Sequence, residues 1–154
     1  MTSADRFISG LLVQCRGAGP LRRVRTGMAL LRAVWHNYRL GSEAARNLPV
    51  DGFKPELTAH NQRGQLLRHL RLHAGLTLLG PPGRLASWAA DALDQHQADS
   101  GRLESHTEVR DNQAGRRCGE ILGSHLRGVL SPDEARTLLA GVLCEDPAAP
   151  RPGA

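Results

Sequence analysis

The sequence predicts an all-α fold, in which a single domain of five or six helices packs as an irregular bundle. A chain of 154 residues can bury one core without help from a metal or from disulfides. Only 3% of the residues are aromatic, so Leu, Ala and Val must fill that core, and such a composition favours helix over sheet. Cys15, Cys118 and Cys144 are odd in number and widely spaced, which argues against a disulfide framework.

The first two predicted helices form a basic N-terminal part, residues 4–41. Apolar residues at helical spacing predict a helix over 4–15, and the Gly and Pro residues at 17–20 end it. A second, amphipathic helix is predicted over 21–40. Its core-facing stripe is predicted to hold Val24, Met28, Leu31, Trp35 and Tyr38, with the arginines mostly on the other side.

Residues 58–143 are predicted to form the helical core of the domain. The segment 48–55 contains two prolines and an Asp-Gly pair, so it is predicted to be a loop, and Thr58 is predicted to cap a helix over 58–79. Gly80-Pro81-Pro82-Gly83 separates this helix from the next, at 84–97. The apolar stripe of that helix is predicted to face the core and holds Leu85, Trp88, Ala89, Ala92, Leu93 and His96.

Two capping-box patterns predict where the last two helices begin. Ser105 with Glu108 predicts a helix over 106–129, and Ser131 with Glu134 predicts one that ends near Leu143. The domain is therefore predicted to cover residues 1–144. The segment 145–154 has three prolines in ten residues and is predicted to be a disordered tail.

Positive charge is concentrated near the N-terminus. Residues 1–50 carry eight arginines against Asp5 and Glu43, a net charge of +6, whereas the remainder is close to neutral. Through Arg22, Arg23 and Arg25 the basic helix is a candidate surface for an acidic protein, nucleic acid or an anionic membrane. Two other interpretations stay open: a solvated arginine face above a core stripe, and a homodimer through the N-terminal helix. Nineteen of the twenty basic residues are Arg, which a GC-rich genome also explains.

The sequence predicts a cytoplasmic protein with neither a cofactor nor a metal. No apolar run approaches the roughly 20 residues of a membrane span, and the start lacks the apolar region of a signal peptide. The Arg-rich composition of residues 6–40 also fits an organelle transit peptide. His69 and His73 have the H-x-x-x-H spacing of two zinc ligands, but Leu70 stands where a metalloprotease needs its Glu base.

The segment from Asp111 to Gly119 predicts a polar site between helices. On a helix, Asp111 continues the apolar stripe of Cys118 and Leu122, so its carboxylate is expected to be buried. A buried carboxylate needs a partner, and the Arg68-His69 pair on another apolar helix is the predicted one. Asn112 and Arg116 share a face with Gly115 and Gly119, whose small size permits close approach of another helix or a ligand.

The segments 61–74, 90–94 and 111–119 resemble a family of uncharacterised bacterial helical domains. That family has an Arg-His helix and a D-N-x-x-G-R helix in the same order, and often occurs at the ends of surface or toxin-like polypeptides. The resemblance covers roughly residues 60–122 and implies a functional set of Arg68, His69, Asp111, Asn112 and Arg116. Leu93 stands where the family tends to have His and Asp94 where it has Glu, which favours a member that retains only the fold.

Two functions follow as hypotheses. The preferred one is a binding or accessory module with a polar inter-helix site that includes His73. The alternative is a hydrolase-like or toxin-like enzyme, with His69 as general base, oriented by Asp111, and with Arg116 and Asn112 stabilising developing negative charge. The sequence leaves open whether the protein is an enzyme.

Overall fold

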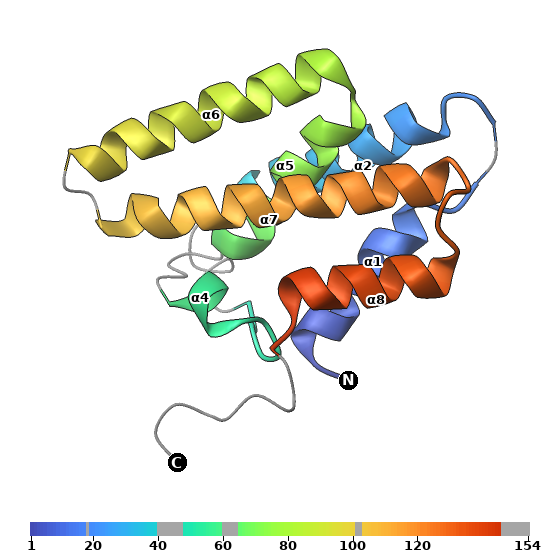
Figure 1. Ribbon diagram of the computed structural model, residues 1–154, viewed down its shortest axis with the longest axis horizontal. Helices are drawn as coiled ribbons and strands as arrows, with labels where there is room; N and C mark the ends of the chain where they lie inside the picture. Colours follow the sequence, from blue (N-terminus) through green and yellow to red (C-terminus); the bar gives the residue numbers. More distant parts are fainter. Residues whose placement is uncertain (18, 40–47, 60–64, 101–102, 146–154) are drawn as a thin grey trace.

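The computed structural model describes residues 1–17, 19–39, 48–59, 65–100 and 103–145, and this part of the chain is mostly helical (Figure 1). The all-α prediction is confirmed, and the described ranges contain seven helices where five or six are predicted. No strand occurs in the described residues, where Phe53 and Cys144 form only an isolated antiparallel bridge. The helices are α1 Ser3–Gln14, α2 Arg22–Arg39, α4 Pro55–Thr58, α5 Gln65–Leu78, α6 Pro81–Asp99, α7 Leu103–Leu126 and α8 Pro132–Leu143.

The additional helix is the single turn α4, which begins where the sequence predicts the end of a loop. Pro55 occupies the first helical position, where its missing N–H costs nothing. The predicted capping role of Thr58 is wrong, because Thr58 is the last residue of α4, where its hydroxyl donates a hydrogen bond to the carbonyl of Pro55. The predicted helix start at 58 therefore belongs to α4, and α5 is described from Gln65.

Helices α5 and α7 pack against each other at the centre, with α2 and α6 against α5 and α8 against α7 (Figure 1). Helices α5 and α7 run parallel, because residues later in α7 contact residues later in α5. Gly115 lies next to His69, and Gly123 lies next to Leu78. Helix α6 runs antiparallel to α7, and α1 packs against α8. The apolar core joins the other six helices but takes no described residue from α6.

Two glycines on α7 allow α5 to approach closely. A Cβ atom at Gly115 would lie 2.9 Å from the Cβ of His73, and one at Gly119 would lie 2.6 Å from the Cβ of Thr77. Both distances are shorter than real Cβ contacts, so any larger residue would push the helices apart. The prediction that these glycines permit close approach is confirmed, and the approaching element is α5.

The predicted core stripe of α2 is wrong at most of its described positions, although Leu31 is half-buried and lies against Gly75 of α5. Val24, Met28 and Trp35 are exposed, and the buried face instead contains Thr26, Gly27, Leu30 and Val34. The reason is steric: a Cβ atom at Gly27 would lie 2.9 Å from the carbonyl oxygen of Gly75 on α5, so only the glycine face of α2 fits there. The side chain of Tyr38 lies outside the described residues.

The predicted core stripe of α6 is also wrong. Leu85, Trp88 and Leu93 are 67%, 64% and 57% exposed, and Ala89 and Ala92 are exposed between them. The face that α6 turns to its neighbours carries Gly83, Ser87, Asp91 and Asp94. Polar side chains thus hold α6 in place, and its apolar side faces solvent.

The helix ends follow the predicted signals in part. Ser131 and Glu134 form the predicted capping box of α8, and an unpredicted box of Thr2 and Asp5 starts α1. The predicted box at Ser105 is wrong, because α7 already begins at Leu103. Helix α7 ends at Leu126, before Gly128, whose φ of 76° suits glycine and stops the helix short of 129.

None of the described helices is both long and apolar enough to cross a lipid bilayer. The predicted disordered tail falls, beyond Glu145, outside the described residues.

Candidate functional site

Polar side chains from α5, α6 and α7 join in one hydrogen-bonded cluster, here called the inter-helix network. Its members are His69 and His73 from α5, Ser87, Asp91 and Asp94 from α6, and Asn112 and Arg116 from α7. Four of them, His69, His73, Ser87 and Asn112, are buried, whereas the two carboxylates and Arg116 reach partly into solvent. The network therefore runs from the interior to the surface along α6.

Asn112 is the centre of this network. Its Nδ2 donates a hydrogen bond of 2.7 Å to Asp94 Oδ2 and a longer one of 3.4 Å to Asp91 Oδ1. Its Oδ1 lies 2.6 Å from His69 Nδ1 and can only accept, so Nδ1 carries the proton of that bond. In neutral His69 the unprotonated nitrogen is then Nε2.

Arg116 links Asp91 and Ser87 of α6 to α7. Its guanidinium forms an ion pair of 2.8 Å with Asp91 and reaches the hydroxyl of Ser87 at 3.5 Å. Asp91 and Asp94 are only partly exposed and face α7, so they do not form the solvated outer pair that their spacing on α6 allows. The charge of Arg116 is thus matched inside the protein, which removes the free cation that the enzymatic hypothesis assigns to this position.

His73 and Ser87 form a buried pair, with His73 Nδ1 2.6 Å from Ser87 Oγ. Burial, and then the charges of His69 and Arg116, lower the pKa of His73 to about 4, while Asp91 acts in the opposite direction. The imidazole is therefore neutral at pH 7. A Ser–His contact can activate a nucleophile. Here Ser87 is fully buried, so a substrate has no access to its hydroxyl.

Asp111 is buried as predicted, but it does not orient His69. Its Oδ1 accepts no hydrogen bond from the described residues, and the Nδ1 of His69 is held by Asn112 instead. Successive residues point about 100° apart around a helix, so Asn112 meets His69 and Asp111 faces elsewhere. Burial, and then the charge of Glu108, raise the pKa of Asp111 to about 8.

The two histidines of the H-x-x-x-H spacing lie side by side but have different partners. Their ring centroids are 6.2 Å apart and nearly parallel, with Asn112 on one Nδ1 and Ser87 on the other. Across the described ranges, no group of three or more His, Cys, Asp or Glu residues is arranged to hold a metal ion. Arg68 precedes His69 on α5 and is half-buried.

The N-terminal arginines predicted to bind a partner include residues that make hydrogen bonds within the protein. Arg22 Nε donates a hydrogen bond of 2.8 Å to the carbonyl of Cys15, and Arg23 donates one of 3.3 Å to the carbonyl of Thr77. Arg25 is exposed. Arg22 thus links the start of α2 to the end of α1, and Arg23 links it to the end of α5, so these two side chains also have a structural role.

Comparison of the chain with protein-family models, with curated proteins and with solved structures finds no match. The resemblance to bacterial helical domains therefore stays a prediction.

Sequence reasoning missed Ser87 and the role of Asp91 and Asp94. These residues lie at i, i+4 and i+7 on one face of α6, a spacing as regular as that of the apolar stripe opposite. The sequence does contain a signal for this orientation. Asn112 and Arg116, four residues apart, need hydrogen-bond acceptors, and the carboxylates of Asp91 and Asp94, three residues apart, can supply them. Because apolar faces normally turn inward, the apolar stripe outweighs that signal.

Proposed function

We propose that this protein is a non-catalytic, protein-binding helical module whose docking surface is the outer face of α6, and that this surface binds a second copy of the chain. The outer face is defined by Leu85, Trp88, Ala89, Ala92 and Leu93. The single observation that carries the proposal is the outward orientation of this stripe, with its three largest side chains more than half exposed.

The inter-helix network supports this proposal because it fixes the rotation of α6 about its axis. Asp91 is bound to Arg116 and Asp94 to Asn112, so turning the apolar stripe inward would break both contacts. It would also leave the buried groups of His73 and Asn112 without their partners on α6, Ser87 and Asp94, which is costly. The network thus holds a contiguous apolar surface in solvent, and such a surface is typical of an interaction site.

A second copy suits this face because its charges are complementary in an antiparallel arrangement. Arg84 flanks the stripe near the start of α6, and Asp99 lies at its end; both are exposed. An antiparallel pair of α6 helices brings each Arg84 towards the partner's acidic end, as an isologous dimer requires. Ala89 and Ala92 lie at the middle of the stripe, where their small side chains allow the two helices to approach.

The buried state of the network favours binding over hydrolysis. A hydrolytic site needs a nucleophile or base that touches substrate and a free donor for developing negative charge. Ser87 and His73 are buried, Arg116 is paired with Asp91, and Asp111 is not the partner of His69. These residues are better suited to holding three helices in register.

Sedimentation velocity over a dilution series tests the proposal, with Trp88→Asp against Trp35→Asp as a matched pair. The two tryptophans are 64% and 68% exposed and lie on different helices, α6 and α2. We expect the wild type and Trp35→Asp to dimerise and Trp88→Asp to stay monomeric. A monomeric wild type at every concentration overturns self-association, and loss of the dimer in Trp35→Asp alone overturns the role of α6.

The antiparallel arrangement is tested separately by charge exchange. Arg84→Glu is expected to weaken the dimer by placing like charges together at each end, and Arg84→Glu with Asp99→Arg is expected to restore it. If the double variant is weaker than Arg84→Glu, the two helices do not pair in antiparallel orientation.

A further inference from the structure

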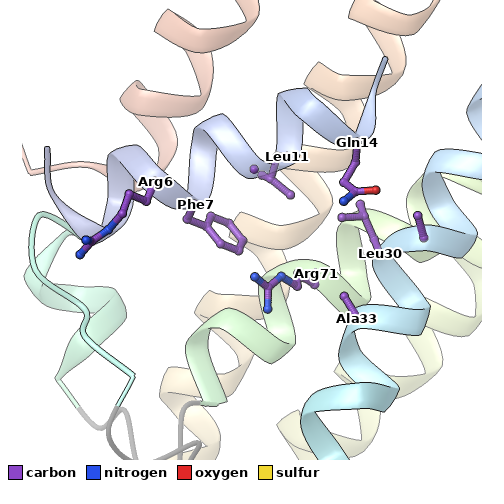
Figure 2. A pocket seen from close by; sticks show the side chains of 9 residues that line it. Arg6, Phe7, Leu11, Gln14, Leu30, Ala33 and Arg71 are labelled. Carbon is purple, nitrogen blue, oxygen red and sulfur yellow. The ribbon is translucent and has the colours of Figure 1, made fainter. Parts of the chain in front are cut away.

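A separate cavity of about 130 Å³ lies between α1, α2 and α5 (Figure 2). This is several times the space that one water molecule needs. Its lining residues are Arg6, Phe7, Gly10, Leu11, Gln14, Ala29, Leu30, Ala33 and Arg71. Helix α6 contributes none of them, so the cavity is independent of the docking surface proposed above.

About half of the cavity wall is apolar. Phe7 and Leu11 lie on α1 and Leu30 lies on α2, and all three belong to the core (Figure 2). Small residues keep the space open: a Cβ atom added to Gly10 would meet nothing within 4 Å. A ligand that contacts this apolar part of the wall needs a short hydrocarbon chain.

The polar part of the wall includes Arg71, which reaches in from α5. Its guanidinium carbon lies 5.3 Å from the centre of the Phe7 ring, a cation–π distance that fixes the side chain (Figure 2). Within the described residues this guanidinium donates no hydrogen bond and forms no ion pair. Burial lowers the pKa of Arg71 from its ordinary value, although a guanidinium stays charged at pH 7.

The lining contains no carboxylate, so the guanidinium of Arg71 makes the cavity electropositive. A partly desolvated guanidinium without a counter-charge is unfavourable, and an anion offsets that cost. The planar fork of Arg matches a carboxylate through two parallel hydrogen bonds. We propose that this cavity is a binding site for a small monocarboxylate with a short apolar chain, whose carboxylate pairs with Arg71 and whose chain lies against Phe7, Leu11 and Leu30.

NMR titration tests the site, with butanoate as the probe and the amide of Gly10 and the Nε–H of Arg71 as reporters. Butan-1-ol has the same apolar chain without the charge, and inorganic phosphate has charge without the chain. We expect saturable shifts of both reporters with butanoate, and binding at least about tenfold weaker with either comparison compound. Equal binding of butan-1-ol or of phosphate overturns the monocarboxylate assignment, and no saturable shift with butanoate overturns the site.

Variants locate the binding. Arg71→Met keeps an apolar stem over Phe7 but removes the charge, and is expected to weaken butanoate binding at least about tenfold. Gly10→Leu places a large side chain at the cavity wall and leaves Arg71 in place. It is expected to abolish binding, which keeps the test decisive if Arg71→Met does not fold. Arg32→Met, on an exposed position of α2 outside the cavity, is the control. Unchanged binding in Gly10→Leu places butanoate elsewhere and overturns the proposal.

Discussion

The side chains of His69 and Asn112 join α5 to α7 through a hydrogen bond of 2.6 Å that is closed off from solvent. Asn112 also binds Asp94 on α6, so one amide holds three helices together. An amide suits this position better than a carboxylate, because it accepts from the imidazole and donates to the carboxylates at the same time.

Replacing Asn112 by Ala is expected to destabilise the protein. The change leaves His69 Nδ1 without an acceptor inside the core and Asp94 without its donor, a loss of about 1–3 kcal/mol in the free energy of unfolding. Urea unfolding at pH 7 measures it. Gln113→Ala, at the exposed neighbouring position, is the control and is expected to change stability by less than about 0.5 kcal/mol. Equal effects of the two variants would mean that the network contributes nothing to stability.

Asp111 is expected to make the protein less stable as the pH rises. Its folded pKa of about 8 exceeds the ordinary 3.8, so the folded state binds more protons between these values and stability falls with increasing pH. His73, with a folded pKa of about 4 against 6.5, acts oppositely between pH 4 and 6.5, because there the unfolded state binds more protons. The effect of Asp111 is therefore clearest between pH 6.5 and 8.

Asp111→Asn isolates this contribution. Between pH 6.5 and 8 the wild type is expected to lose up to about 1.4 kcal/mol of stability per pH unit, whereas Asp111→Asn is expected to lose little and to be the more stable protein at pH 8. Urea unfolding at half-unit pH intervals measures both slopes. Parallel curves for the two proteins would show that Asp111 does not titrate in this range.

Gly115→Ala is expected to destabilise the contact between α5 and α7. The new methyl group would lie 2.9 Å from His73 Cβ and 3.0 Å from two backbone oxygens, and relieving this costs about 1–3 kcal/mol. Gly141→Ala in α8 is the control, because a Cβ atom there meets nothing within 4 Å. It is expected to stabilise the helix by about 0.5–1 kcal/mol. Thermal unfolding of both variants measures these changes in stability. A Gly115→Ala variant more stable than the wild type would show that the contact between α5 and α7 is not tight.

The three thiols are expected to differ in reactivity in the folded protein. Burial raises the pKa of Cys15 to about 11 and that of Cys118 to about 12, so neither forms a thiolate near neutral pH. Cys144 is half-buried at the end of α8, and burial raises its pKa as well. A thiol-specific disulfide reagent at pH 7.5 is therefore expected to label Cys144 alone, and slowly. Cys144→Ser is expected to abolish labelling of the folded protein, until urea exposes the thiols of Cys15 and Cys118. Fast labelling of Cys15 or Cys118 in the folded protein would contradict their burial.

The sequence is sufficient to predict the fold class, most helix positions and the region of the network, but not the orientation of two helices. The capping box at Ser131, the burial of Asp111 and the role of Gly115 follow from local rules, and the structure agrees. The apolar stripe of α6 has the predicted helical period, but it faces solvent and not the core. Its direction depends on partners more than fifteen residues away in the chain, Asn112 and Arg116, and periodicity within one helix contains no information about them.

Helix α6 contributes no described residue to the apolar core and is held mainly by hydrogen bonds and one ion pair. Detaching it would expose few buried apolar atoms, so the helix can open while α5, α7 and α8 stay folded. The amides of α6 should then exchange with solvent hydrogen well before those of its neighbours. A docking surface on such an element is coupled to a local order–disorder equilibrium, and a bound partner would slow that exchange by favouring the closed form.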